Sequence, residues 1–165
     1  MDVLSTNDPL YRNLVLTMKA FPSILSLTVA LATFAAQAGE GWLTDFKAAQ
    51  AAAEKDNKAI LIDFTGSDWC SWCIKMKKES LDKPAFTEFA KKQLILVEAD
   101  FPNSKPQTDA EKAQNKELQK KYKVSGYPTF VLVDAKGKEL GRQEGYLEGG
   151  PDKFNAAIKG WLAKK

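Results

Sequence analysis

Histidine is absent from all 165 residues of the sequence. Its absence excludes histidine metal ligands, Ser–His triads and Cys–His nucleophile pairs, so any catalysis must use other groups. Cysteine is scarce as well, because Cys70 and Cys73 are the only two. Two cysteines without histidine cannot supply the roughly four ligands of a structural zinc site within one chain. A c-type haem site is excluded too, because Ile74 stands where that motif requires histidine.

The chain also lacks a strong excess of charge of either sign. Its formal net charge is +3 at pH 7, and no basic stripe with interleaved aromatic residues is present. We therefore expect no binding to nucleic acid. Hydrophobic residues make up 44% and charged residues 27% of the sequence, as in an ordinary globular protein, and the length fits one domain.

The first 38 residues are typical of an export signal. No residue from 20 to 38 is charged, Lys19 precedes this run, and residues 24–34 form its apolar core. Small residues at the end of the run, Ala36-Gln37-Ala38, match the pattern that signal peptidase accepts. The sequence therefore predicts cleavage after Ala38 and a periplasmic or otherwise exported domain over residues 39–165.

The alternative for this segment is an uncleaved membrane anchor. A membrane-spanning helix needs about 20 strongly apolar residues, and serines and threonines dilute this stretch. We therefore expect no stable membrane insertion after cleavage. Residues 1–17 carry Asp2, Asp8 and Arg12 ahead of a signal that is complete from Met18. This predicts that Met18 is the true start, and a peptide from residues 1–17 in native material would contradict it.

Helix and strand patterns alternate along the rest of the chain. Short apolar runs predict buried strands at 59–64, 94–100 and 129–133, and a turn leads into a fourth strand at 138–144. Periodicity and start signals, including a capping box at Thr108 and Glu111, predict helices at 44–57, 70–81, 84–92, 108–122 and from 151 onward. Strands separated by helices pair in parallel, and the closing hairpin is antiparallel. The predicted fold class is α/β, with a central mixed sheet of about four strands flanked by helices.

The segment Trp69-Cys70-Ser71-Trp72-Cys73 places both thiols at the start of a predicted helix. Backbone amides and the helix dipole favour a thiolate there, which predicts Cys70 as the nucleophile. Cys73 lies one turn further along and is predicted to resolve the mixed disulfide. The alternative is a structural disulfide, which exported proteins commonly contain. Such a bond would close a very small loop and constrain the unfolded chain little.

Three segments together resemble the thioredoxin superfamily: Asp63-Phe64, the segment from Trp69 to Cys73, and Gly126-Tyr127-Pro128-Thr129-Phe130. The sequence is most similar to small exported thioredoxin-like domains of bacterial envelopes, of the thiol:disulfide interchange type. The resemblance covers nearly all of residues 39–165. It implies a thioredoxin fold and a protein-disulfide oxidoreductase that needs no metal or organic cofactor.

The resemblance also implies roles for residues outside the cysteine pair. It implies a cis peptide bond between Tyr127 and Pro128, beside the cysteines, where the backbone binds an extended substrate segment and the proline helps to exclude metal. Taken alone, Pro128 is more typical of an ordinary strand start, and the cysteine pair reverses that preference. Asp63 is implied to assist proton transfer at Cys73, with a pKa raised by burial. The alternatives are an Asp63 that faces solvent, or Asp68 in its place.

Several features bear on substrates and on the direction of electron flow. Trp69 matches the family and is expected to shield the site, whereas an exposed Trp72 would offer an apolar contact surface for substrate. Ser71-Trp72 stands where thioredoxin has Gly-Pro. The histidine of strongly oxidising relatives is missing there, and its absence favours a reducing or electron-passing role. Leu96 stands where thioredoxin has a lysine near its buried acid.

The predicted partners are protein thiol or disulfide substrates and an envelope redox partner. The alternative function is a non-catalytic binding module in which the disulfide serves as a fixed brace.

Overall fold

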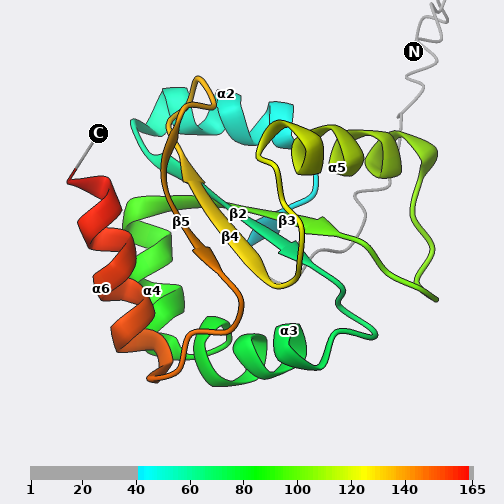
Figure 1. Cartoon of the computed structure of the whole chain (residues 1–165). Coiled ribbons are helices and arrows are strands. Elements are labelled where there is room, and N and C mark those ends of the chain that lie inside the picture. Colours follow the sequence, from blue (N-terminus) through cyan, green and yellow to red (C-terminus); the bar gives the residue numbers. More distant parts are fainter. Residues whose placement is uncertain (1–40, 164–165) are drawn as a thin grey trace, which may run out of the picture. The chain divides into compact units, whose positions relative to one another are not determined.

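The computed structural model describes residues 41–163, and their centre is one mixed β-sheet (Figure 1). The strand order is β1-β3-β2-β4-β5, parallel from β1 through β3 to β2, and antiparallel from β2 through β4 to β5. This arrangement confirms the predicted α/β class and mixed sheet. The strands are β1 (Trp42–Leu43), β2 (Ala59–Thr65), β3 (Leu94–Asp100), β4 (Thr129–Val133) and β5 (Glu139–Glu144).

Strand β1 adds a fifth strand to the four expected. It has only two residues, which pair with Leu96 and Val97 of β3. A segment this short cannot show an alternating pattern, so only its pairing in the folded chain defines it as a strand.

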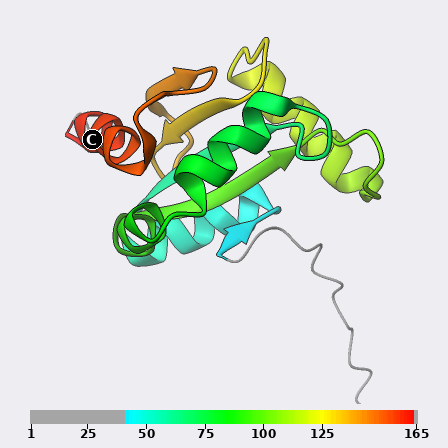
Figure 2. The same ribbon diagram turned by 90° about the horizontal axis from the view of Figure 1, so that it is seen from below.

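Helices cover both faces of the sheet (Figures 1 and 2). Helices α2 and α5 pack on one face, whereas α3, α4 and α6 pack on the other. Their bounds are α2 (Phe46–Asp56), α3 (Ser71–Met76), α4 (Pro84–Gln93), α5 (Asp109–Lys121) and α6 (Gly150–Leu162). The predicted capping box is present. The Thr108 hydroxyl accepts a hydrogen bond from the Glu111 amide at 3.2 Å, and the Glu111 carboxylate accepts one from the Thr108 amide at 3.1 Å.

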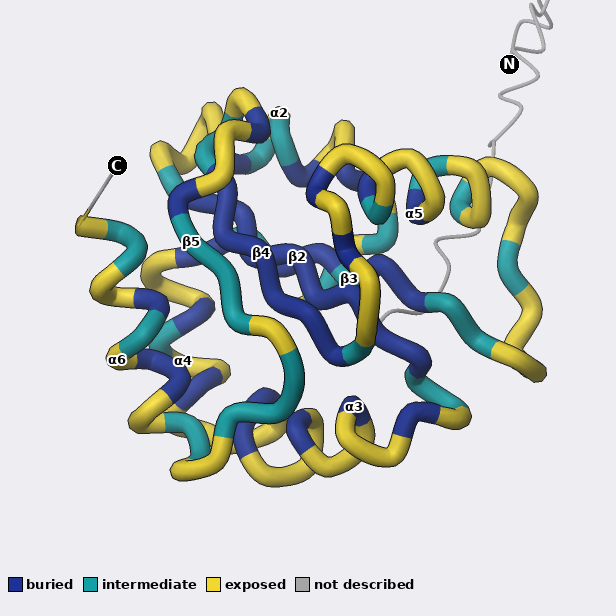
Figure 3. The backbone as a smooth tube through the Cα atoms, viewed as in Figure 1, coloured by how far each residue is buried: buried dark blue, intermediate teal, exposed yellow. Residues whose placement is uncertain are grey.

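Strand β2 separates two hydrophobic cores. Ile62 and Phe64 belong to the core under α2 and α5, while Leu61 belongs to the core under α3, α4 and α6. All residues of β2 and β4 are buried (Figure 3). Because alternate residues of a strand point to opposite faces, Asp63 points to the same face as Leu61.

The predicted helix over residues 70–81 is divided in the structure. Helix α3 ends at Met76, and a π-helical turn, η1 (Lys77–Leu81), continues it. The Lys77 carbonyl accepts a hydrogen bond from the Asp82 amide at 2.9 Å. A π-turn inserts one residue into the helix and changes which residues face the sheet. Here Ser80 and Leu81 are both buried, an outcome that helical periodicity alone does not indicate.

The predicted export signal over residues 1–38, with its predicted start at Met18, lies outside the described residues. Between residues 41 and 163, no helix combines the length and the apolar character that crossing a membrane requires.

Candidate active site

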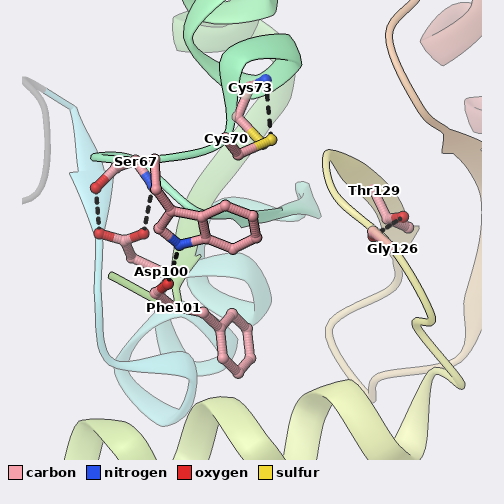
Figure 4. Close-up of a disulfide and its surroundings, with 8 residues drawn as sticks. Ser67, Cys70, Cys73, Asp100, Phe101, Gly126 and Thr129 are labelled. Atoms are coloured by element: carbon pink, nitrogen blue, oxygen red, sulfur yellow. Dashed lines mark hydrogen bonds between the residues drawn. A yellow bond between two sulfur atoms is a disulfide. The ribbon is translucent and has the colours of Figure 1, made fainter. Parts of the chain in front are cut away.

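Cys70 and Cys73 form a disulfide at the start of α3 (Figure 4), with the sulfurs 2.14 Å apart and the Cα atoms 5.2 Å apart. Cys70 is the N-cap of α3, and its sulfur accepts a hydrogen bond from the Cys73 amide at 3.2 Å. Amide groups at a helix start favour negative charge, so this position favours a thiolate on Cys70 after reduction. The exposed fractions are 7% for Cys70 and 4% for Cys73. Cys73 is therefore the more buried of the two, by a small margin.

The turn that precedes Cys70 is fastened to the loop that follows β3 (Figure 4). The Asp100 carboxylate accepts hydrogen bonds from the Ser67 amide, at 2.9 Å, and from the Ser67 hydroxyl. The indole N–H of Trp69 donates to the Phe101 carbonyl at 2.8 Å. These bonds hold the residues directly ahead of the cysteine pair in place.

Asp68 adds three further bonds between these two segments. Its carboxylate accepts hydrogen bonds from the backbone amides of Asn103, Ser104 and Lys105, at 2.9, 2.7 and 3.3 Å. These hydrogen bonds, that from Asn103 foremost, lower the pKa of Asp68. A carboxylate held in its ionised form is poorly suited to store a proton, so Asp68 is a poor replacement for Asp63. We call the bonds between residues 67–69 and 100–105 the loop clamp.

A second turn, at Gly126–Pro128, leads into β4. The peptide bond between Tyr127 and Pro128 is cis. The Pro128 carbonyl accepts a hydrogen bond from the Gly145 amide at 2.8 Å. The Tyr127 ring meets Trp69 edge-on, with centroids 5.9 Å apart, and stacks on Phe101 at 5.2 Å. Trp69 therefore connects the cysteine turn to the proline turn.

Asp63 lies within β2 on the face that α3 covers. It is only 6% exposed, which rules out the alternative of a solvent-facing aspartate. Within the described part of the chain, its Oδ1 atom has no hydrogen-bond partner. Burial raises the pKa of Asp63 well above its ordinary value, and the charges of Glu98 and Asp100 raise it further, while Lys77 opposes them. Asp63 therefore keeps its proton to a higher pH than an exposed aspartate does.

Trp72 projects from α3 into solvent, with 55% of its surface exposed. Its ring lies 5.4 Å from the ring of Tyr146, and the Lys75 ammonium lies 5.3 Å from the Trp72 centroid and 4.6 Å from that of Tyr146. The Tyr146 hydroxyl donates to the Glu79 carboxylate. Trp69 is 46% exposed, so the indole rings of Trp69 and Trp72 are both partly open to solvent near the start of α3.

Sequence patterns did not indicate Phe101 or Tyr146, and Glu98 was overlooked. Phe101 and Tyr146 lie in loops without periodicity, and only tertiary contacts bring them to Tyr127 and Trp72. Glu98 did carry a signal, since it is a charged residue inside an apolar strand. In the parallel pairing of β2 with β3 it stands opposite Asp63. Across residues 41–163, no three acidic or cysteine side chains are grouped so that they could hold a metal ion.

Comparisons with known proteins identify a matching domain family and a similar relative. Residues 46–160 match the model of the thioredoxin-like domain family. The disulfide bond reductase DsbH of Chlamydia pneumoniae is 42% identical over 110 residues, which are 67% of this chain and 66% of that protein. This chain therefore corresponds to just under two thirds of that relative's length.

Solved structures show the same likeness. A structure titled DsbH oxidoreductase is 36% identical and superposes with a TM-score of 0.70, covering 79% of this chain and 92% of that one. A thioredoxin from Thermus thermophilus is 22% identical with a TM-score of 0.51, over 70% of this chain and 80% of that one. The second likeness concerns the fold alone.

Proposed function

The chain belongs to the thioredoxin-like domain family, and we propose that it is an exported thiol–disulfide oxidoreductase that reduces disulfides of envelope proteins. One observation carries the proposal: the two cysteines of the chain form a disulfide at the start of a helix, where Cys70 caps α3. In this position a backbone amide already points at the Cys70 sulfur. The same contact stabilises the thiolate that attacks a substrate disulfide.

The reaction proceeds through a mixed disulfide. The Cys70 thiolate attacks one sulfur of the substrate disulfide, a new S–S bond forms, and the other substrate sulfur leaves as a thiolate. The Cys73 thiol then gives its proton to Asp63 or to water and attacks Cys70. The bond between Cys70 and the substrate breaks, and the second substrate sulfur leaves with the electron pair. Two electrons pass to the substrate, and the Cys70–Cys73 disulfide is regenerated.

The substrate segment binds across the surface around the disulfide. The backbone before Pro128 bonds to an extended segment in the manner of an added strand. Trp69 and Trp72 offer apolar contact beside the reactive sulfur, with Tyr127 behind Trp69. Unfolded or misoxidised protein segments, which expose apolar residues, fit such a surface.

Three features support the reducing direction and the exported location. No histidine stands between the cysteines to stabilise the reduced pair and make the disulfide a strong oxidant. The DsbH relative is named as a disulfide bond reductase. The apolar segment within residues 1–38 supports export, and electrons are supplied by an envelope redox partner through dithiol exchange.

Reduction of insulin by dithiothreitol tests the activity. We expect the full chain to accelerate insulin reduction and the Cys70→Ser variant to lose that acceleration. Cys73→Ser should instead accumulate mixed disulfides with substrate, because the resolving thiol is missing. A chain whose disulfide resists mild reductant and does not accelerate insulin reduction would be a binding module with a fixed brace, and the proposal would fall.

The reduction potential of the cysteine pair tests the direction. We expect a value near or below about −230 mV, towards that of thioredoxin, when the protein is equilibrated with dithiol buffers and trapped. A value near about −120 mV would instead identify an oxidant that donates its disulfide to folding proteins.

A further inference from the structure

Glu98 of β3 stands directly opposite Asp63 of β2 in the parallel pairing of the two strands. Paired residues of neighbouring strands point to the same face, and the strands lie about 4.8 Å apart. The two carboxyl groups are therefore close neighbours on the face that α3 covers. At such a separation, and partly shielded from water, two negative charges repel each other strongly.

The two carboxyl groups differ in their access to water. Asp63 is 6% exposed, and its Oδ1 atom has no hydrogen-bond partner among the described residues. Glu98 is half-buried. An unpaired charge is more costly in the drier position. When the pair carries one charge, that charge therefore resides on Glu98 and the proton on Asp63.

The other charges around Asp63 do not replace Glu98 in this role. Asp100, two residues along β3, accepts two hydrogen bonds from Ser67. The Ser67 hydroxyl in turn accepts a hydrogen bond from the Lys105 ammonium at 2.8 Å. Lys77, on η1, opposes the acids, but its ammonium is bonded to Asp82 at 2.7 Å.

The remaining neighbour across the sheet is apolar, because Phe130 of β4 pairs with Asp63. After burial itself, the charge of Glu98 raises the pKa of Asp63 the most, followed by that of Asp100.

We propose that Glu98 is a positioning residue for thiol–disulfide exchange, whose carboxylate keeps on Asp63 the proton that Asp63 exchanges with the Cys73 sulfur. The inference rests on the proposed function. During substrate reduction, Asp63 takes the proton from the Cys73 thiol as the Cys70–Cys73 bond forms and the bond from Cys70 to substrate breaks. When a partner dithiol attacks the disulfide at Cys70, the Cys73 sulfur leaves with the electron pair and takes that proton back.

The test is Glu98→Gln, which removes the charge and keeps the shape of the side chain. The midpoint of the Asp63 carboxyl titration, followed by NMR in the full chain with labelled aspartate, should move to lower pH. The rising limb of the pH profile for the Cys73 step, measured in single turnovers of the mixed disulfide, should move in the same direction. Its plateau should fall, because a weaker base accepts the proton less readily.

Two further variants separate charge from structure. Glu98→Asp retains the charge and should keep the midpoint close to that of the wild type. Glu54→Gln is the matched control, since it removes one exposed carboxylate from α2 on the opposite face of the sheet. An unchanged midpoint in Glu98→Gln overturns the proposal, and so does a rate loss that is equal at every pH.

These readouts also separate this inference from the proposed function. If the wild type fails to reduce insulin while Glu98→Gln still shifts the Asp63 titration, the oxidoreductase proposal falls and the coupling between the two carboxyl groups stands. If insulin is reduced and the Asp63 titration is the same in both proteins, the role of Glu98 falls and the oxidoreductase proposal stands.

Discussion

At the residue scale, Asp63 is a carboxyl group that the fold buries with one oxygen unpaired. Nothing in the packing of β2 requires a charge there, since Leu61, which points to the same face as Asp63, belongs to a hydrophobic core. Natural proteins retain such a destabilising group where function needs it. The proton transfer between Asp63 and Cys73 that we propose would be such a need.

This burial predicts how stability depends on pH. The pKa of Asp63 is raised in the folded state, chiefly by burial. Below the pKa of an aspartate in the unfolded chain, about 3.9, both states hold the proton. As the pH rises through that value, the unfolded chain releases its proton first, so the free energy of unfolding falls until the folded-state pKa is passed.

Asp63→Asn cannot ionise and therefore avoids this loss. We expect it to raise the free energy of unfolding near pH 8 by about 1.4 kcal/mol for each unit by which folding raises the pKa of Asp63. Near pH 3 the variant should show no such gain. Urea unfolding of the oxidised protein at both pH values measures the difference, and an equal effect at both would contradict the argument.

At the scale of elements, the loop clamp joins the turn before α3 to the loop after β3. Neither segment is a helix or strand, so their shape depends on side-chain hydrogen bonds rather than on a backbone ladder. Asp68 alone accepts three backbone amides from residues 103–105. The clamp thereby positions Trp69, whose ring in turn contacts Tyr127.

Removing this acceptor should loosen the loop more than the domain. We expect Asp68→Ala to lower the free energy of unfolding, because three backbone amides lose their acceptor. Hydrogen exchange at the amides of residues 103–105 should accelerate by more than it does in the core strands. Asp56→Ala, which removes an exposed carboxylate at the end of α2, is the matched control. Equal exchange rates in both variants would show that the clamp does not hold the loop.

At the scale of the whole molecule, local signals predicted most of the fold. The structure confirms the strands predicted from the apolar runs of β2, β3 and β4, and the capping box predicted at Thr108. These predictions succeeded because each signal depends on a few adjacent residues. The π-turn at Lys77–Leu81 and the strand β1 were missed. The first depends on one inserted residue, and the second depends on pairing with β3.

The candidate site also divides into residues that local motifs indicate and residues that only the folded chain brings together. The cysteine pair, Asp63, Trp69 and the Tyr127–Pro128 turn were indicated by motifs, and their catalytic and binding roles remain predictions. Glu98 was overlooked because its significance arises from register, when β3 pairs with β2 and sets it opposite Asp63. No pattern within one strand reports which residue of another strand will stand beside it.

The two hydrophobic cores on either side of the sheet also predict how the molecule responds to reduction. Their members come from every helix and from the strands β2, β3, β4 and β5, and neither core contains Cys70 or Cys73. The disulfide joins residues only three apart in the sequence. A loop this small constrains the unfolded chain by about 2 kcal/mol at most.

Reduction should therefore leave the fold intact. We expect the free energies of unfolding of the oxidised and reduced proteins to differ by no more than about 2 kcal/mol. Urea unfolding with and without excess dithiothreitol measures this difference, and the Cys70→Ser/Cys73→Ser double variant should match the reduced protein. A redox pair must open and close at every turnover, so a site of this kind requires a fold that does not depend on it. A chain that unfolds on reduction would instead use its disulfide as a brace.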